Sequence, residues 1–369
     1  MTQDTRWPSH GGQAAPLLTR FGLPCDHPLL DFSTNLNPLG APDWVPSCLA
    51  AAAKGLERYP TPDYRLAREA IAREAGVSLE QVLLTNGGAE AIFLVAAAHA
   101  GGQAVIVQPT FTEYARACRA FAIAIDDVCL TPPDFSLDPA RLAVSLDRGT
   151  LLFLCRPNNP TATLLPRETI EALLTLAALR GSRVVIDEAF IDFVTPFDES
   201  LAPLLARFDN LILLRSLTKL YALPGLRMGY LLASASLVRE LQACQPPWSV
   251  NHLAAELVTP LLADGAFQAR TRQWLSGEHP RLQAGLAAKG LEVIPSRANF
   301  FLVRPPLETV VGSAQTASAA LFERLLRAGI LARHTHGFPG LDGDWLRLAL
   351  REGDANTRLL AALSEERTA

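Results

Sequence analysis

The chain has 369 residues, 49% of them hydrophobic, with a formal net charge of −4 and a pI near 6.0. This size and composition suit roughly two domains with large cores, and the slightly acidic balance argues against a nucleic-acid-binding surface. Six dispersed cysteines without a CxxC pair predict a reduced, cytoplasmic protein, and the lack of an apolar run of about 18 residues predicts no membrane span.

Residues 1 to about 42 are rich in Pro, Gly, Asn and His, and we expect an extended arm rather than a packed element. Short apolar strands then alternate with helices, which indicates a mainly parallel sheet covered on both faces. The strands expected are 82–84, 104–107, 123–128, 151–155, 184–186, 211–214 and 230–232. The helices expected in the same part of the chain are 45–56, 64–75, 90–100, 112–120 and 168–179.

The alternation of short strands and helices ends at about residue 255, and a long helix is expected further on, at 267–289. It leads into a smaller α+β unit, with strands at 298–303, 330–333 and 346–350 and helices at 315–328 and 356–363. We therefore expect an α/β protein in three parts: an N-terminal arm (1–42), a large domain (43–255) and a small C-terminal domain (256–369).

Lys219 follows the apolar run 211–214, in a chain that has only three lysines. Ser216 precedes it by three residues, and Arg227 follows it by eight. An amine that reacts with an aldehyde, together with a hydroxyl and a guanidinium that bind a phosphate, is what pyridoxal phosphate requires. For a single lysine after a strand, an exposed surface residue is the ordinary alternative.

Other residues with suitable chemistry follow other predicted strands. Gly88 and Ala89 open a helix whose N–H groups can bind a phosphate. Phe111 can stack on a flat ring, Asn159 can bond a phenolic oxygen or a carboxylate, and Asp187 needs a cationic partner such as a pyridinium nitrogen. Each also has an ordinary explanation, such as a tight turn, a core aromatic or a helix cap. Their shared position at the carboxyl ends of strands favours one cofactor site.

From about residue 9 to 365, the chain resembles the fold type I pyridoxal phosphate enzymes and is close to the histidinol-phosphate aminotransferases. Within this group it is most similar to the threonine-phosphate decarboxylases of cobalamin biosynthesis. The resemblance is carried by segments 10–12 (HGG), 30–40 (LDFSTNLNPLG), 58–60 (RYP), 187–193 (DEAFIDF), 214–219 (LRSLTK), 247–251 (PWSVN) and 338–342 (FPGLD).

The resemblance implies that Lys219 and Asp187 are catalytic and that the arm lies over the active site. It implies a pyridoxal phosphate site made of Gly88, Ala89, Phe111, Asn159, Asp187, Ser216, Lys219 and Arg227. Tyr59 would reach the cofactor phosphate of the neighbouring subunit in a homodimer. The residues expected to bind a small phosphorylated amino-acid substrate are His10, Gly11, Asn35, Asn159, Arg333 and Arg347. No metal is implied.

Two positions depart from the usual pattern of these relatives. Ala162 stands where the family usually has Gly, which makes the turn after Asn159 less permissive. Phe190 stands where the histidinol-phosphate aminotransferases usually carry Tyr, and with the His-Gly-Gly segment it favours decarboxylation of O-phospho-L-threonine. An aminotransferase acting on histidinol phosphate or a related phosphorylated amine, and a non-catalytic subunit of a biosynthetic complex, are the alternatives.

Overall fold

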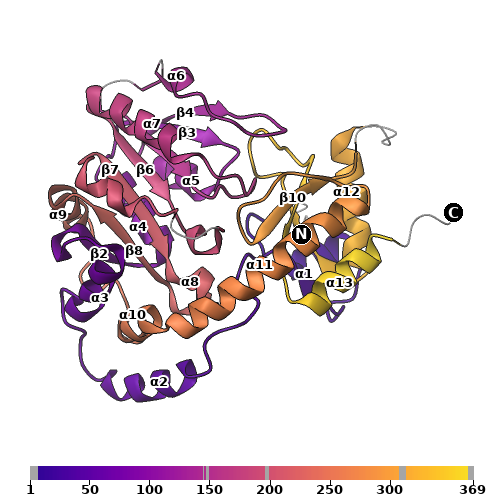
Figure 1. Cartoon of the computed structure of the whole chain (residues 1–369), viewed down its shortest axis with the longest axis horizontal. Coiled ribbons are helices and arrows are strands. Elements are labelled where there is room, and N and C mark those ends of the chain that lie inside the picture. The colour runs from indigo at the N-terminus through magenta and orange to yellow at the C-terminus, as the bar shows by residue number, and fades with distance from the viewer. Residues whose placement is uncertain (1–6, 144, 147–148, 196–198, 307–312, 365–369) are drawn as a thin grey trace, which may run out of the picture.

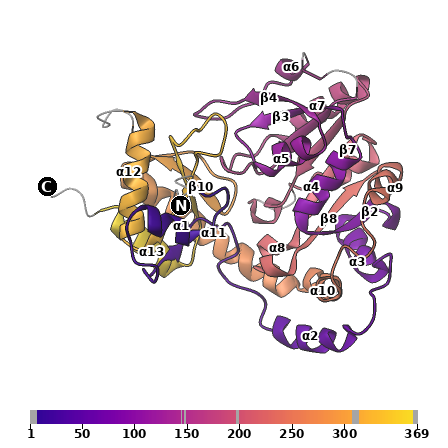
Figure 2. The ribbon, with the colours of Figure 1, turned by 180° about the vertical axis from the view of Figure 1, so that it is seen from behind.

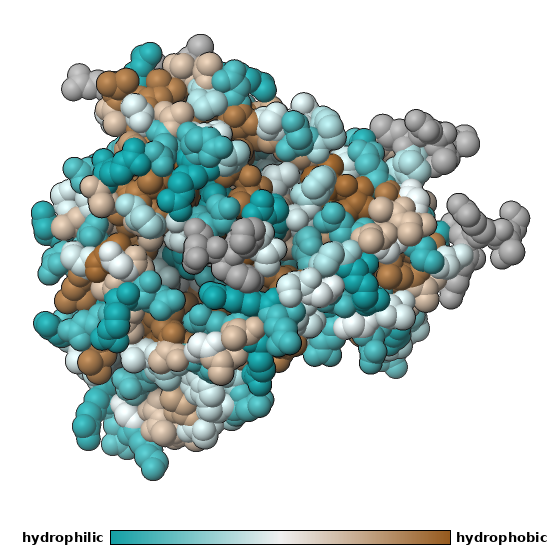
Figure 3. Space-filling view, viewed as in Figure 1, coloured by the Kyte–Doolittle hydropathy of each residue, from teal (hydrophilic) through white to brown (hydrophobic). Residues whose placement is uncertain are grey.

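The computed structural model describes residues 7–143, 145–146, 149–195, 199–306 and 313–364. A larger unit is built on a seven-stranded sheet and a smaller one on a four-stranded sheet. Helix α11 (Gly265–Ala288) runs from the larger unit to the smaller one (Figures 1 and 2). On the face seen in Figure 3, hydrophilic and hydrophobic residues are interspersed. No helix in the described part of the chain is long and apolar enough to cross a membrane.

The seven strands are arranged in the order β2-β8-β7-β6-β5-β3-β4, and β8 runs antiparallel to the other six. This confirms the expected mainly parallel sheet. The strands are β2 (Val82–Asn86), β3 (Gln103–Gln108), β4 (Ala124–Cys129), β5 (Leu151–Cys155), β6 (Arg183–Asp187), β7 (Leu211–Ser216) and β8 (Met228–Ala233).

Helices cover both faces of this sheet, which is why its central strands carry apolar residues on both faces over most of their length. In β5, Leu152 and Leu154 belong to one hydrophobic core, and Phe153 between them belongs to a second. The first core includes side chains of α3 (Arg65–Ala75), α7 (Arg167–Leu179) and α10 (His252–Ala263), and the second those of α4 (Gly87–Ala97), α5 (Glu113–Ala120) and α9 (Ala235–Ala243). The remaining helices of this unit are α2 (Val45–Ala52), α6 (Pro139–Leu142) and α8 (Leu217–Leu220).

The smaller unit has an antiparallel sheet in the order β12-β13-β10-β9. Its strands are β9 (Glu292–Val293), β10 (Phe300–Arg304), β12 (Arg333–His334) and β13 (Leu346–Ala349), and its helices are α12 (Ala314–Arg327) and α13 (Gly353–Ala362). The strand expected at 330–333 is divided, because β11 (Ile330–Leu331) pairs with the N-terminal segment and β12 pairs with β13.

The N-terminal segment is packed, so the prediction of an extended arm was wrong for part of it. Helix α1 (Ala14–Arg20) buries Leu17 and Leu18, and β1 (Leu30–Asp31) pairs in parallel with β11. The high Gly and Pro content of this segment obscured the short apolar pair, whose packing partners lie in the C-terminal unit. Figures 1 and 2 show this end of the chain against that unit.

Candidate active site

A cavity of about 440 Å³ lies where the large sheet, the smaller unit and the N-terminal segment meet. Each of the three parts contributes to its wall. The lining residues are Ser9, His10, Gly11, Ser33, Thr34, Asn35, Ala89, Phe111, Thr112, Glu113, Asn159, Phe190, Lys219, Arg227, Arg333, Phe338 and Arg347.

One end of the cavity is built to bind an anion. Ser216, at the end of β7, is the pairing partner of Gly229 in β8. Gly229 in turn lies against Gly88, because a Cβ added to Gly229 would be only 2.7 Å from the Gly88 nitrogen. The α4 helix begins at this point, and its first N–H groups lack acceptors within the helix. The Arg227 guanidinium completes the group, since a Cβ on Gly87 would lie 2.8 Å from Arg227 Nη2.

Asp187 is a buried carboxylate with two donors already in place. The Tyr114 hydroxyl donates to Oδ2 at 2.8 Å, and the Ala189 N–H donates to Oδ1 at 2.9 Å. Burial nevertheless raises the pKa of the Asp187 carboxyl, although both donors and the charge of Lys219 oppose this effect. A cationic partner in the cavity would therefore stabilise the carboxylate.

The Lys219 amine faces the same cavity from α8, directly after β7. Burial, and then the charges of Arg347 and Arg227, lower its pKa to about 8, while Asp187 acts in the opposite direction. Its Nζ lies 5.9 Å from the centre of the Phe190 ring. Lys219 is thus an amine whose neutral, nucleophilic form is accessible near neutral pH.

Opposite Lys219, Arg347 is held in place by side-chain and backbone oxygens. Its Nη1 donates to Asn159 Oδ1 and its Nη2 to the Ser33 carbonyl, both at 2.5 Å. Its Nε and both amide atoms of Asn35 are buried without hydrogen-bond partners among the described residues. Burial, followed by the charge of Arg333, lowers the pKa of Arg347 to about 9. Buried polar groups without partners, next to a buried guanidinium, have the chemistry that suits a carboxylate ligand.

A second cationic group lies at Arg333, whose pKa is lowered to about 10 by burial. Its guanidinium donates to the carbonyls of Pro8 and Ser9 at 2.7 and 2.6 Å. His10 is the next residue after Ser9 in the chain, and its Nε2 lies 3.4 Å from the Glu113 carboxylate. Neither Arg333 nor Arg347 forms an ion pair with a carboxylate in the described ranges, so both charges are available to an anionic ligand.

The loop that carries Asn35 is fixed by Asp31. The Asp31 Oδ1 accepts hydrogen bonds from the backbone N–H and the hydroxyl of Ser33, and the Asp31 Oδ2 accepts one from the hydroxyl of Thr34. Asn37 then joins the loop to the segment that carries Lys219, because its N–H donates to the Lys219 carbonyl at 3.0 Å. The order of these residues in the LDFSTNLNPLG segment is thereby explained by local geometry.

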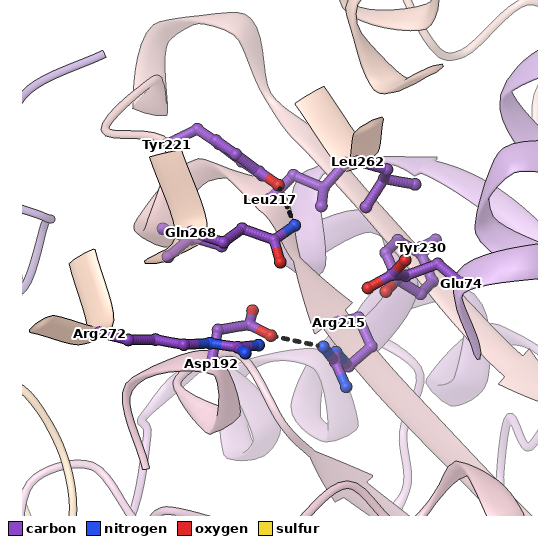
Figure 4. Close-up of a pocket in the computed structure, with 10 residues that line it drawn as sticks. Glu74, Asp192, Arg215, Leu217, Tyr221, Tyr230, Leu262, Gln268 and Arg272 are labelled. Atoms are coloured by element: carbon purple, nitrogen blue, oxygen red, sulfur yellow. Dashed lines mark hydrogen bonds and ion pairs between the residues drawn. The ribbon is translucent and has the colours of Figure 1, made fainter. Parts of the chain in front are cut away.

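A second cavity, of about 50 Å³, lies behind α8 and is too small for a cofactor. Figure 4 shows polar side chains in its wall beside Leu217 and Leu262, with Asp192 bonded to Arg215 and Gln268 bonded to Tyr221. Arg215 also binds the buried Glu188 at 3.1 Å. The second and third carboxylates of the DEAFIDF segment, Glu188 and Asp192, therefore pair with Arg215, whereas the first, Asp187, is close enough to Lys219 to interact with its charge.

The structure brings most of the predicted site residues together. Those that line the cavity are Ala89, Phe111, Lys219, Arg227, His10, Gly11, Asn35, Asn159, Arg333 and Arg347. Gly88, Ser216 and Asp187 lie just behind them through the contacts described above. Tyr59 is elsewhere: its side chain is 81% exposed and packs on Trp248, with ring centres 4.8 Å apart.

Sequence reasoning assigned no role to Glu113 and Phe338, which line the cavity, or to Tyr114, which orients Asp187. A signal for Glu113 and Tyr114 was present, since both lie within three residues of Phe111, which follows a predicted strand. Ala162 has a positive φ of 61°, so the left-handed conformation for which the family usually uses Gly is retained here by Ala.

The residues present fit the cofactor that the sequence suggested. The anion site at α4, the buried carboxylate of Asp187 and the amine of Lys219 match the phosphate, ring nitrogen and aldehyde of pyridoxal phosphate. The class defined by this fold and site is the fold type I group of pyridoxal phosphate enzymes.

Comparisons with known proteins support the same class. The model of the family "Aminotransferase class I and II" matches residues 27–363, and the chain belongs to this family. It is 39% identical to the threonine-phosphate decarboxylase of Salmonella typhimurium, over 96% of this chain and 95% of that protein.

Two solved structures share the fold. The histidinol-phosphate aminotransferase of Clostridium acetobutylicum has a TM-score of 0.83 at 27% identity, over 91% of this chain and 98% of the other. The L-threonine-O-3-phosphate decarboxylase of Porphyromonas gingivalis has a TM-score of 0.76 at 28% identity, over 90% and 98%.

Proposed function

We propose that this protein uses pyridoxal phosphate to decarboxylate O-phospho-L-threonine, which yields (R)-1-aminopropan-2-ol O-2-phosphate for cobalamin biosynthesis. The observation that carries the proposal is the presence of two buried arginines, Arg333 and Arg347, in the cavity of Lys219. Such a site suits a substrate with two anionic groups. The similarity to the Salmonella typhimurium decarboxylase supports the same substrate.

The cofactor would be held by Gly88, Ala89, Ser216 and Arg227 at its phosphate and by Asp187 at its ring nitrogen. Phe111 offers an aromatic face to the ring. When bound, pyridoxal phosphate supplies an aldehyde that captures the substrate amine and a cationic ring that accepts electrons from Cα.

We assign the substrate carboxylate to Arg347, Asn159 and Asn35, which all line the cavity and of which Arg347 and Asn159 are hydrogen-bonded to each other. The substrate phosphate is placed by Arg333 and His10. Loss of carbon dioxide breaks the bond between Cα and the carboxyl carbon, and the electron pair left at Cα must then take up a proton. Lys219, with its pKa lowered to about 8, is suited to donate that proton.

Transamination of histidinol phosphate is the alternative reaction. That substrate has a phosphate but no carboxylate, so the unpartnered groups of Asn35 and Arg347 would find no matching anion. Phe190 also supplies no hydroxyl to the cofactor. A non-catalytic role is disfavoured because Lys219, Asp187 and Arg227 lie around one site.

We also infer a two-fold homodimer in the cytoplasm. Tyr59 is exposed beside Trp248, and Leu56 and Leu66 are 58% and 74% exposed, which supports burial of this region by a second copy. Six free cysteines support a reducing compartment. Sedimentation of a fully active monomer would contradict the dimer.

The function is tested with the purified enzyme supplied with pyridoxal phosphate. One reaction contains O-phospho-L-threonine, and the other contains histidinol phosphate with a keto acid as amino-group acceptor. We expect carbon dioxide and the phosphorylated amino alcohol from the first, and no transamination in the second. Transamination of histidinol phosphate without any decarboxylation of phosphothreonine would show that the proposal is wrong.

A further inference from the structure

Trp7 lies outside the cavity and packs on the C-terminal unit. Its ring stacks on His336, with centres 4.5 Å apart and planes at 25°, and meets the edge of Phe322 at 5.1 Å. The Arg20 guanidinium lies 4.5 Å from its ring centre. His334 is also 4.5 Å away, and burial lowers its pKa to about 2, so the imidazole that packs on Trp7 is neutral. Such aromatic and cation–π contacts stabilise a short segment that has little other buried surface.

Residues 8–12, here called the strap, are fixed at several points after Trp7. Arg333 holds the carbonyls of Pro8 and Ser9. A Cβ on Gly11 would lie 2.2 Å from the Ser33 carbonyl oxygen, so the strap lies directly against that loop. The Gly12 N–H donates to Ser33 Oγ at 2.7 Å.

The strap also reaches the larger unit. His10 lies 3.4 Å from Glu113, the first residue of α5, whose side chain is only 10% exposed. The strap therefore runs from the aromatic contacts of Trp7, past Arg333, to a nearly buried carboxylate of the larger unit that also lines the cavity. Arg333 contacts the strap with the same guanidinium that would face the substrate phosphate.

We propose that Trp7 is a positioning residue that anchors the strap, so that His10 and Arg333 together form the phosphate seat of the substrate. This inference rests on the proposed function for the identity of the substrate, but the seat itself is a property of the chain. Trp7 touches neither the Lys219 amine nor the cofactor-binding residues. Its removal should therefore weaken phosphate binding and leave the chemical step and the cofactor in place.

The test compares Trp7→Ala, Trp7→Phe and the unaltered enzyme, each loaded with pyridoxal phosphate. We expect Trp7→Ala to raise the KM for O-phospho-L-threonine by about tenfold or more, with kcat changed by less than about threefold. Trp7→Phe keeps an aromatic ring and should recover most of the loss. Trp274→Ala, which removes a half-buried indole from α11 away from the cavity, is the matched control for general destabilisation.

A second measurement does not depend on turnover: the affinity of the loaded enzyme for inorganic phosphate, determined by calorimetry. Trp7→Ala should weaken it by a factor similar to that for KM, with an unchanged cofactor absorption spectrum. Gly11→Ala, which displaces the strap near its other end, should also weaken phosphate affinity. It replaces Trp7→Ala in this measurement if that variant does not fold. Unchanged phosphate affinity in a folded Trp7→Ala variant, or a loss confined to kcat, would overturn the inference, and so would unchanged affinity in Gly11→Ala where Trp7→Ala does not fold. Failure of every enzyme, including the unaltered one, to decarboxylate phosphothreonine would instead count against the proposed function.

Discussion

In the cofactor-free enzyme, Lys219 should react as an amine with a strongly lowered pKa. Burial, Arg347 and Arg227 lower this pKa from 10.5 to about 8. At pH 8 about half of the amine is then neutral, compared with roughly 0.3% of an unperturbed lysine, a difference of ~150-fold in the reactive form. Because the neutral form grows as pH rises, acylation of Lys219 should increase with pH and level off above about pH 9.

The assay is brief acetylation at a series of pH values, with each lysine quantified by mass spectrometry of peptides. The chain contains only two other lysines, Lys54 and Lys289, and both are exposed, so they serve as references in the same digest. Arg347→Met should move the midpoint of Lys219 upward by removing a cation. Asp187→Asn should move it downward by removing the carboxylate that favours the charged amine.

A midpoint for Lys219 near 10.5 would refute this reasoning, because it would mean that the amine is solvated like that of a surface lysine. Shifts of the wrong sign in the two variants would refute the assignment of the neighbouring charges, even if the midpoint itself lies near 8.

Three further outcomes are expected. Asp187→Asn should fold, as judged by circular dichroism, but lose at least about a hundredfold in turnover of phosphothreonine, or ~3 kcal/mol in the barrier; near-normal turnover at full cofactor occupancy would exclude its role. Tyr114→Phe removes a donor from the buried Asp187 carboxylate and should destabilise the cofactor-free protein by about 1–3 kcal/mol in urea unfolding, and an unchanged midpoint and slope would show that this bond contributes nothing. Arg347→Ala should lower kcat/KM by a factor that corresponds to about 2–5 kcal/mol, the cost of losing a buried charged contact. A decrease in kcat/KM of less than about tenfold would contradict carboxylate binding at Arg347.

The part of the fold that the sequence predicted well is the part in which neighbours in the chain are also neighbours in space. The strands of the large sheet were found because each is a short apolar run between helical patterns. Lys219, Asp187 and Asn159 were found with them, because each lies at or just after the carboxyl end of a buried strand, where the cavity forms.

The contacts that were not predicted depend on distant partners. Tyr114 lies in an ordinary helical pattern, and its bond to Asp187 requires α5 to pack beside β6 across the intervening β5. The packing of α1 requires partners that lie in the C-terminal unit. Local propensity contains no information about such pairs, so only the folded chain reveals them.

The pairing of β1 with β11 has a consequence for how the protein is made. Leu30 lies beside Ile330, 300 residues later in the chain. The strands of the large sheet all lie between residues 82 and 233, so that unit can fold while synthesis continues. The N-terminal segment is synthesised before the large sheet, but β1 has to wait for β11 before it can pair. A nascent chain released before residue 330 would contain Lys219 and the residues expected to bind the cofactor, yet would lack both the strand that pairs with β1 and the two arginines that we propose bind the substrate.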